Sequence, residues 1–127
     1  MALSDLQQSP MMNHIVQALQ QHQDIGHYGR LVFAMVGQYF LSEKEIIDLL
    51  AKDPDCDNEK ARSILNQVKA HGYTPPKPDR ILAWMNEQDF AICDTAGQDK
   101  NTCNVYKSLK FPPEVYDRIA GYYQDSR

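Results

Sequence analysis

Apolar residues recur at intervals of three and four over most of the chain, which is the spacing of one face of an α-helix. The first such stretch follows Ser9-Pro10, a pair typical of a helix start because serine caps free amides and proline fits the first turn. Its apolar positions are Met11, Met12, Ile15, Val16 and Leu19. The pattern predicts a helix with one buried face from residue 10 onward.

A second helix is predicted over His27–Phe40, and it is apolar on almost every side, which indicates a place at the centre of the domain. Ser42 and Glu45 then form a capping box, in which each side chain accepts a hydrogen bond from the other residue's backbone N–H. A third helix is expected to follow this box and to end before Pro54.

A fourth helix is predicted between Asp57, a suitable N-cap, and Gly72, which is suited to a helix end. Residues 73–78 contain three prolines and are expected to form an extended loop, because proline lacks the amide hydrogen and fixes φ. Asp79 is expected to cap a short helix that runs through Met85.

The rest of the chain is predicted to be less regular. Residues 86–111 are largely polar, a short strand fits Phe90-Ala91-Ile92, and a last helix starts at Pro112-Pro113-Glu114. Residues 1–8 lack periodicity and are expected to be flexible. The sequence therefore predicts a mainly α fold, a compact helical domain of about five to six helices with an irregular C-terminal third, forming one domain over 9–127.

The composition is that of a single globular domain: 127 residues, 43% of them hydrophobic and 24% charged. No apolar run is long enough to cross a bilayer, and the N-terminus lacks the segments of a signal peptide, so we expect a cytoplasmic protein without membrane contact. Neither a nucleophile–base–acid set nor a glycine-rich phosphate loop is present, so we expect no enzymatic activity.

The three cysteines Cys56, Cys93 and Cys103 cannot all pair within one molecule, and reduced thiols are the default in a cytosol. Cys93 and Cys103, with nine residues between them, are either a loop disulfide or two free thiols, since structural zinc needs four ligands. The acids over 53–59 lack the central glycine and distal glutamate of a calcium loop. We predict no metal and no cofactor; the alternative is a metal or cluster held by the three cysteines and an outside ligand.

The formal net charge of −4 counts against a dedicated nucleic-acid binder, because phosphate neutralisation dominates such binding. The charge is unevenly distributed, however. Residues 40–59 hold seven acids and two bases, whereas residues 60–80 hold five bases and a single acid, Asp79. The five bases are Lys60, Arg62, Lys69, Lys77 and Arg80. This polarity fits either two ordinary solvated faces or a surface that attracts phosphate.

His27-Tyr28-Gly29-Arg30 stands at the predicted start of the second helix. The free amides and the dipole of a helix start favour an anion, and Arg30 can add two parallel hydrogen bonds to a phosphate. His27 and Arg30 lie three residues apart, so both side chains can face the same way. The alternative is structural: Gly29 permits close packing while Arg30 pairs with a nearby acid.

Several segments, taken in order, resemble the C-terminal domain of the archaeal and eukaryotic DNA primase large subunit. They are Ser9-Pro10-Met11-Met12, His27-Tyr28-Gly29-Arg30, Leu41-Ser42-Glu43-Lys44-Glu45-Ile46-Ile47, Asn66-Gln67-Val68, Tyr73-Thr74-Pro75-Pro76, Ile92-Cys93 and Cys103. The resemblance covers residues 9–110. It implies a helical domain of DNA replication whose His-x-x-Arg helix start grips a template–primer junction and the 5′-triphosphate of the primer.

The departures from that family concern its iron–sulfur cluster. The family holds a [4Fe–4S] cluster with four cysteines, but Met11 and Pro78 stand at the first two of these positions. Cys93 and Cys103 match the last two, so the resemblance implies that the cluster has been lost. Asn66 also replaces a helical tyrosine that the family uses near its nucleic acid. We expect the shape to be retained and the original function changed.

The residues and the resemblance together predict a non-catalytic domain that binds nucleic acid, DNA or RNA, and recognises the phosphates of a single-strand or junction end. The resemblance implies His27 and Arg30 as phosphate contacts. The basic residues that would assist them are Lys60, Arg62, Lys69, His71, Lys77 and Arg80. The alternative is a protein–protein interaction adaptor without nucleic-acid binding, which docks a larger partner through acidic residues 40–59 or through Tyr116, Tyr122 and Tyr123.

Overall fold

A computed structural model describes residues 3–93 and 103–118, and it confirms the mainly α fold. This described part of the chain contains eight helices and no strand. The helices are α1 (Leu3–Leu6), α2 (Pro10–Gln20), α3 (Gly26–Gly37), α4 (Glu43–Leu50), α5 (Asn58–His71), α6 (Pro78–Met85), α7 (Val105–Ser108) and α8 (Pro113–Arg118).

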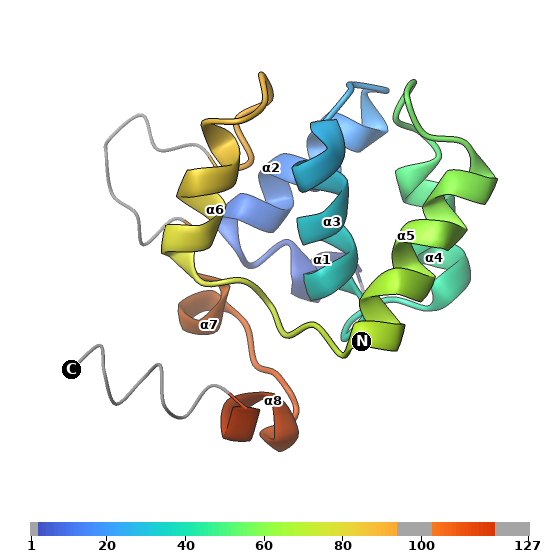
Figure 1. The fold of residues 1–127 in the computed structure, drawn as a ribbon. Coiled ribbons are helices and arrows are strands. Elements are labelled where there is room, and N and C mark those ends of the chain that lie inside the picture. Colours follow the sequence, from blue (N-terminus) through green and yellow to red (C-terminus); the bar gives the residue numbers. More distant parts are fainter. Residues whose placement is uncertain (1–2, 94–102, 119–127) are drawn as a thin grey trace.

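Helix α3 lies in the middle of the molecule, as its apolar sequence predicts. Figure 1 shows α6 on one side of α3 and the antiparallel pair α4 and α5 on the other, with α2 crossing behind. Val32, Phe33 and Val36 of α3 are fully buried. Burial of such side chains is worth about 1.5–3 kcal/mol each, so this helix is a main source of stability.

Most of the predicted helix caps are confirmed, but Asp79 does not cap α6, because that helix begins at Pro78 with Lys77 as its N-cap and Asp79 lies in its first turn. The Ser9 hydroxyl accepts from the Met12 amide at the start of α2, and Asp57 accepts from the Lys60 amide at the start of α5. Ser42 and Glu45 form both hydrogen bonds of the capping box before α4. At the end of α5, Gly72 takes the left-handed conformation, with φ 61°.

Two further local expectations were wrong. Residues 3–6, which we expected to be flexible, form α1, because Leu6 is fully buried in the core and anchors this turn. The strand expected at Phe90-Ala91-Ile92 is absent, since the described chain offers no strand with which it can pair. Instead Phe90 stacks on His14, with 5.2 Å between ring centroids, and His14 Nε2 donates to the Ala91 carbonyl at 2.9 Å.

The C-terminal described segment also packs on the core. Tyr106 of α7 and Phe111 are buried, and their rings contact each other at 5.4 Å between centroids. The short helices α1 and α7 add to the five or six helices that the sequence predicts. Within the described residues, no helix combines the length and the apolar character that crossing a bilayer requires.

Candidate functional site

At the start of α3, where we expected an anion, three backbone amides already donate to side chains of the protein. Asp24 accepts from the Gly26 amide at 2.9 Å, and Asp53 accepts from the Ile25 amide at 3.0 Å. The Gln88 carbonyl oxygen accepts from the Tyr28 amide at 2.9 Å. Two carboxylates and one amide therefore occupy the positions that phosphate oxygens would take.

Arg30 faces the same acids from inside the domain. Its side chain is 3% exposed, and its Nη1 donates to Asp53 Oδ2 at 2.8 Å, with Asp53 fully buried. Asp24 lies 3.3 Å from Nη1, and Asp55 lies 3.6 Å from Nη2. The expectation that Arg30 contacts phosphate is wrong for this structure, because the guanidinium is buried and neutralised by these acids. His27 is exposed on the same turn, so His27 and Arg30 do not form one site.

The bases of α5 face the acids of neighbouring segments. Lys60 contacts Asp55, donating to its carbonyl at 3.1 Å and lying 3.7 Å from its carboxylate. Lys69 pairs with Glu43 of α4, and this contact holds the pKa of Glu43 below its usual value. Arg62 lines a surface hollow that also contains Glu43 and Lys44. Lys60 and Lys69 are therefore paired with acids, and the role in phosphate attraction expected of these three bases stays a prediction.

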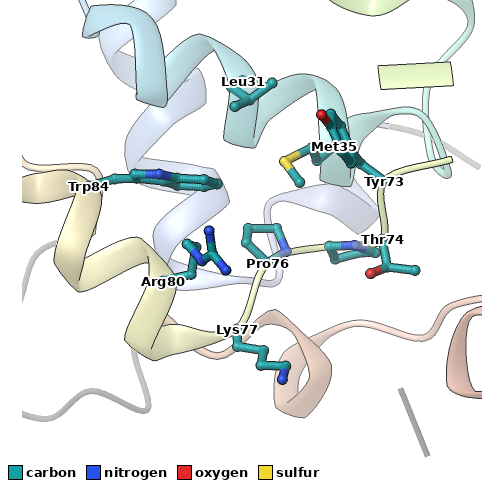
Figure 2. Close-up of a pocket in the computed structure, with 9 residues that line it drawn as sticks. Leu31, Met35, Tyr73, Thr74, Pro76, Lys77, Arg80 and Trp84 are labelled. Carbon is teal, nitrogen blue, oxygen red and sulfur yellow. The ribbon is translucent and has the colours of Figure 1, made fainter. Parts of the chain in front are cut away.

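Lys77 and Arg80 lie together at a groove between α3 and α6, closed along one edge by the extended segment before α6. The groove has a volume of about 360 Å³. It is lined by Leu31, Met35, Tyr73, Thr74, Pro75, Pro76, Lys77, Arg80 and Trp84. Figure 2 shows Leu31 and Met35 reaching into it from α3, and Trp84 and Arg80 from α6. We call this feature the α3–α6 groove.

One wall of the α3–α6 groove is a column of stacked side chains. The Trp84 indole stacks on Tyr28, with 5.3 Å between centroids and 14° between planes. The Arg80 guanidinium carbon lies 5.9 Å from the indole centroid, and Figure 2 shows this group beside the ring, facing Pro76. His27 packs edge-on against Tyr28 at 5.3 Å. The column thus links the exposed His27 to the groove, which the buried Arg30 does not reach.

The opposite wall is an extended segment held by hydrogen bonds from several elements. Tyr73 stacks on His71 at 5.2 Å and 16°, which places His71 beside this wall. The Gln38 side chain donates to the Tyr73 carbonyl at 3.3 Å, and the Tyr106 hydroxyl donates to the Pro75 carbonyl. Because the backbone is fixed at these points, the groove is formed before any ligand arrives.

The sequence patterns did not indicate the uncharged residues of the groove, which are Leu31, Met35, Tyr73, Thr74, Pro75, Pro76 and Trp84. One signal was available, since Arg80 and Trp84 are four residues apart and so share a helix face. The other walls come from segments far apart in the sequence. No local pattern brings Leu31 next to Tyr73.

The cysteines divide into one pair and one single thiol. Cys93 and Cys103 form a disulfide, with 5.6 Å between their Cα atoms, which decides between the two states that the sequence left open. Cys56 is a buried free thiol, and burial raises its pKa. Among the described residues, no group of three or more His, Cys, Asp or Glu side chains is arranged to hold a metal ion. Tyr122 and Tyr123, named as docking residues, lie outside the described residues.

Comparisons with known proteins found no relative. No family model matches the chain, and neither the curated proteins nor the solved structures give a significant match. The resemblance to the primase large subunit therefore stays a prediction. At its cluster positions, Met11 is fully buried in the core and Pro78 begins α6.

Proposed function

We propose that this domain is a non-catalytic module that binds single-stranded nucleic acid, and that the α3–α6 groove holds part of the strand. The observation that carries the proposal is the meeting of aromatic and cationic side chains at one preformed groove, with Arg80 beside Trp84 and Lys77 at its edge. Single strands are bound by this combination, because bases stack on aromatic rings or guanidinium planes while cations attract phosphates.

The size of the groove limits what enters it. Its volume of about 360 Å³ lies near the lower end of the range for small-ligand sites, roughly 300–1,000 Å³. This suits one unstacked base with its sugar and is too small for a duplex. The apolar side chains Leu31, Met35 and Pro76 would contact the base, and Lys77 and Arg80 would lie near the adjoining phosphates. Stacking contributes about 1–3 kcal/mol per base in comparable sites.

The proposed ligand is still nucleic acid, as the sequence predicts, but its proposed site is the α3–α6 groove and no longer the start of α3. The predicted phosphate contacts His71, Lys77 and Arg80 belong to the groove region, whereas Arg30 does not. His27 lies at the far end of the stacked column and would contact a strand only beyond the groove. The net charge of −4 opposes nucleic acid over most of the surface, so attraction is expected to be local and weak at physiological salt.

The test is a titration of a short fluorescent single strand at low salt, read by anisotropy. The double variant Lys77→Ala/Arg80→Ala is compared with Lys44→Ala/Lys52→Ala, which loses the same charge at exposed positions outside the groove. We expect affinity to fall about tenfold or more in the groove variant and less than about twofold in the control. The slope of log affinity against log salt should become shallower by about 0.7 for each phosphate that the variant no longer neutralises.

Equal affinities of the two double variants would overturn the groove assignment, and absence of any binding at low salt would overturn the function. Duplex DNA and strands with a 5′-triphosphate serve as further ligands. Preference for the 5′-triphosphate would support recognition of a strand end, whereas preference for duplex would contradict the proposal.

The apolar lining supports a second candidate, an adaptor whose groove receives a peptide side chain of a partner protein. Leu31, Met35 and the two prolines give the groove walls that a buried aliphatic or aromatic side chain can fill. Salt separates the two candidates, because burial of apolar surface is not screened whereas phosphate attraction is. Binding of the partner that persists at high salt, with no binding of single strands, would favour the adaptor.

A further inference from the structure

The Cys93–Cys103 disulfide is connected to the α3–α6 groove through α7. The disulfide joins the segment after α6 to the residue just before Asn104, and both cysteines are fully buried. Asn104 caps α7 by accepting from the Tyr106 amide at 3.1 Å. Tyr106, three residues beyond Cys103, is 8% exposed and donates its hydroxyl hydrogen to the Pro75 carbonyl. Pro75 is itself a wall of the groove.

Helix α7 has little stability of its own. It has four residues, and so short a helix is held by its tertiary contacts and by its covalent attachment. Its buried side chains are Val105 and Tyr106. The disulfide restricts how far this segment can leave the core, because the chain on its N-terminal side is tied to Cys93.

We propose that the Cys93–Cys103 disulfide is a redox latch that holds the Tyr106 hydroxyl on Pro75 and so keeps the groove in its binding shape. The inference rests on the proposed function, of which it describes the regulation. When the disulfide is reduced, α7 is attached only through its own contacts, and the segment from Tyr73 to Lys77 loses its support on one side. The same chain then binds its ligand weakly in reducing surroundings and tightly in oxidising ones.

The chemical step is thiol–disulfide exchange with a dithiol reductant. One thiolate of the reductant attacks a sulfur of the Cys93–Cys103 bond, which breaks to form a mixed disulfide and one free cysteine thiol. The second thiol of the reductant then attacks the mixed disulfide. The reductant leaves as a cyclic disulfide, and its two protons end on the thiols of Cys93 and Cys103. Since both sulfurs are buried, we expect reduction to require a local opening of the segment and to be slow.

The experiment compares the full chain in its oxidised form, after dithiothreitol, and as Cys93→Ser/Cys103→Ser. Alkylation and mass determination count the thiols: one in the oxidised form, from Cys56, and three after reduction. Hydrogen–deuterium exchange then follows the Tyr73 amide, which donates to the Val68 carbonyl at 3.2 Å, and anisotropy follows the single strand. We expect at least fivefold faster exchange and at least fivefold weaker binding without the disulfide.

Two variants separate the latch from general stabilisation. Tyr106→Phe keeps the disulfide but removes the donor to Pro75, so the oxidised variant should resemble the reduced protein in both measurements. Cys56→Ser removes the other thiol and should change neither. Unchanged exchange at the Tyr73 amide after complete reduction would refute the latch, whether or not nucleic acid binds. Faster exchange with no strand binding in any form would uphold the latch and refute the nucleic-acid function.

Discussion

Arg30 donates to Asp53 at 2.8 Å, and both side chains lie inside the domain, 3% and 0% exposed. Asp53 also accepts from the Ile25 amide and, through its other oxygen, from the Asp55 amide at 2.7 Å. One carboxylate therefore joins the start of α3 to the loop between α4 and α5. The pair connects segments that are distant in sequence, and both carboxylate oxygens are engaged by partners from the protein itself.

Removing one member of this pair should destabilise the fold strongly. Asp53→Ala leaves the Arg30 guanidinium buried without its closest counter-charge, which costs about 3–5 kcal/mol in such pairs. Urea denaturation at neutral pH measures the loss of unfolding free energy. Lys44→Ala breaks the exposed pair with Asp48 and serves as the control, with an expected change below about 0.5 kcal/mol. Similar losses of unfolding free energy in Asp53→Ala and Lys44→Ala would contradict the structural role of the buried Arg30–Asp53 pair.

Arg30→Met should affect stability rather than binding. We expect the folded fraction of this variant to bind a single strand within about twofold of the parent affinity, because Arg30 does not line the groove. Anisotropy titrations corrected for the active fraction decide this. A tenfold loss of affinity with the fold intact would show that Arg30 contacts the ligand and would return the site to the start of α3.

Two glycines at helix ends should respond in opposite ways to alanine. Gly72 has φ 61°, so Gly72→Ala is expected to cost about 1–2 kcal/mol from the left-handed backbone alone. Its new methyl group would also lie 3.2 Å from the Arg118 guanidinium. Gly37 ends α3 without such a conformation, and a methyl group there meets Ile46 at an ordinary 3.8 Å. Gly37→Ala should therefore be neutral or stabilising by up to about 1 kcal/mol in thermal or urea unfolding.

The capping box before α4 predicts a pH dependence. Ser42→Ala should cost about 1 kcal/mol at neutral pH. The Ser42 amide, by donating to the Glu45 carboxylate, holds the pKa of Glu45 below its usual value of 4.5. This contribution is complete above pH 4.5 and is lost as the pH falls through the lower folded pKa. The stability difference between the parent and Glu45→Ala should therefore shrink on acidification, and a difference that grows would be inconsistent with the box.

Changing Gln88 to glutamate should destabilise the fold. Its oxygen accepts from the Tyr28 amide, and its nitrogen donates to the carbonyls of Ile25 and Phe90 at 2.9 and 3.1 Å. In Gln88→Glu the second oxygen would face two carbonyls, and we expect a loss of about 2 kcal/mol in urea unfolding. Gln67→Glu, at an exposed position of α5, is the matched control and should change stability little.

Local features of the fold could be predicted because they depend on neighbours in the sequence. Ser42 and Glu45 are three residues apart, and Gly72 ends its own helix, so their roles follow from spacing and backbone preference. The helix α1 could not be predicted in this way. Its four residues show no period, and Leu6 is ordered by core contacts that the sequence does not reveal.

The site was predicted less well, because its residues also depend on partners that are distant in the sequence. The pattern at His27 and Arg30 fits an anion site, yet the deciding acid, Asp53, lies 23 residues beyond Arg30. The interpretation that Arg30 pairs with an acid was available, but spacing alone could not identify that acid. The groove is assembled from α3, the segment after Gly72 and α6, so only the tertiary arrangement brings its walls together.

The stacked pair of Tyr28 and Trp84 gives the domain an intrinsic fluorescence signal at the groove. Trp84 is the single tryptophan of the chain, so its emission comes from one known position at the wall of the groove. Tyr28, in face-to-face contact with the indole, is placed to pass excitation energy to it. Whatever enters the groove, whether nucleotide or peptide, should change this emission without a label on either molecule.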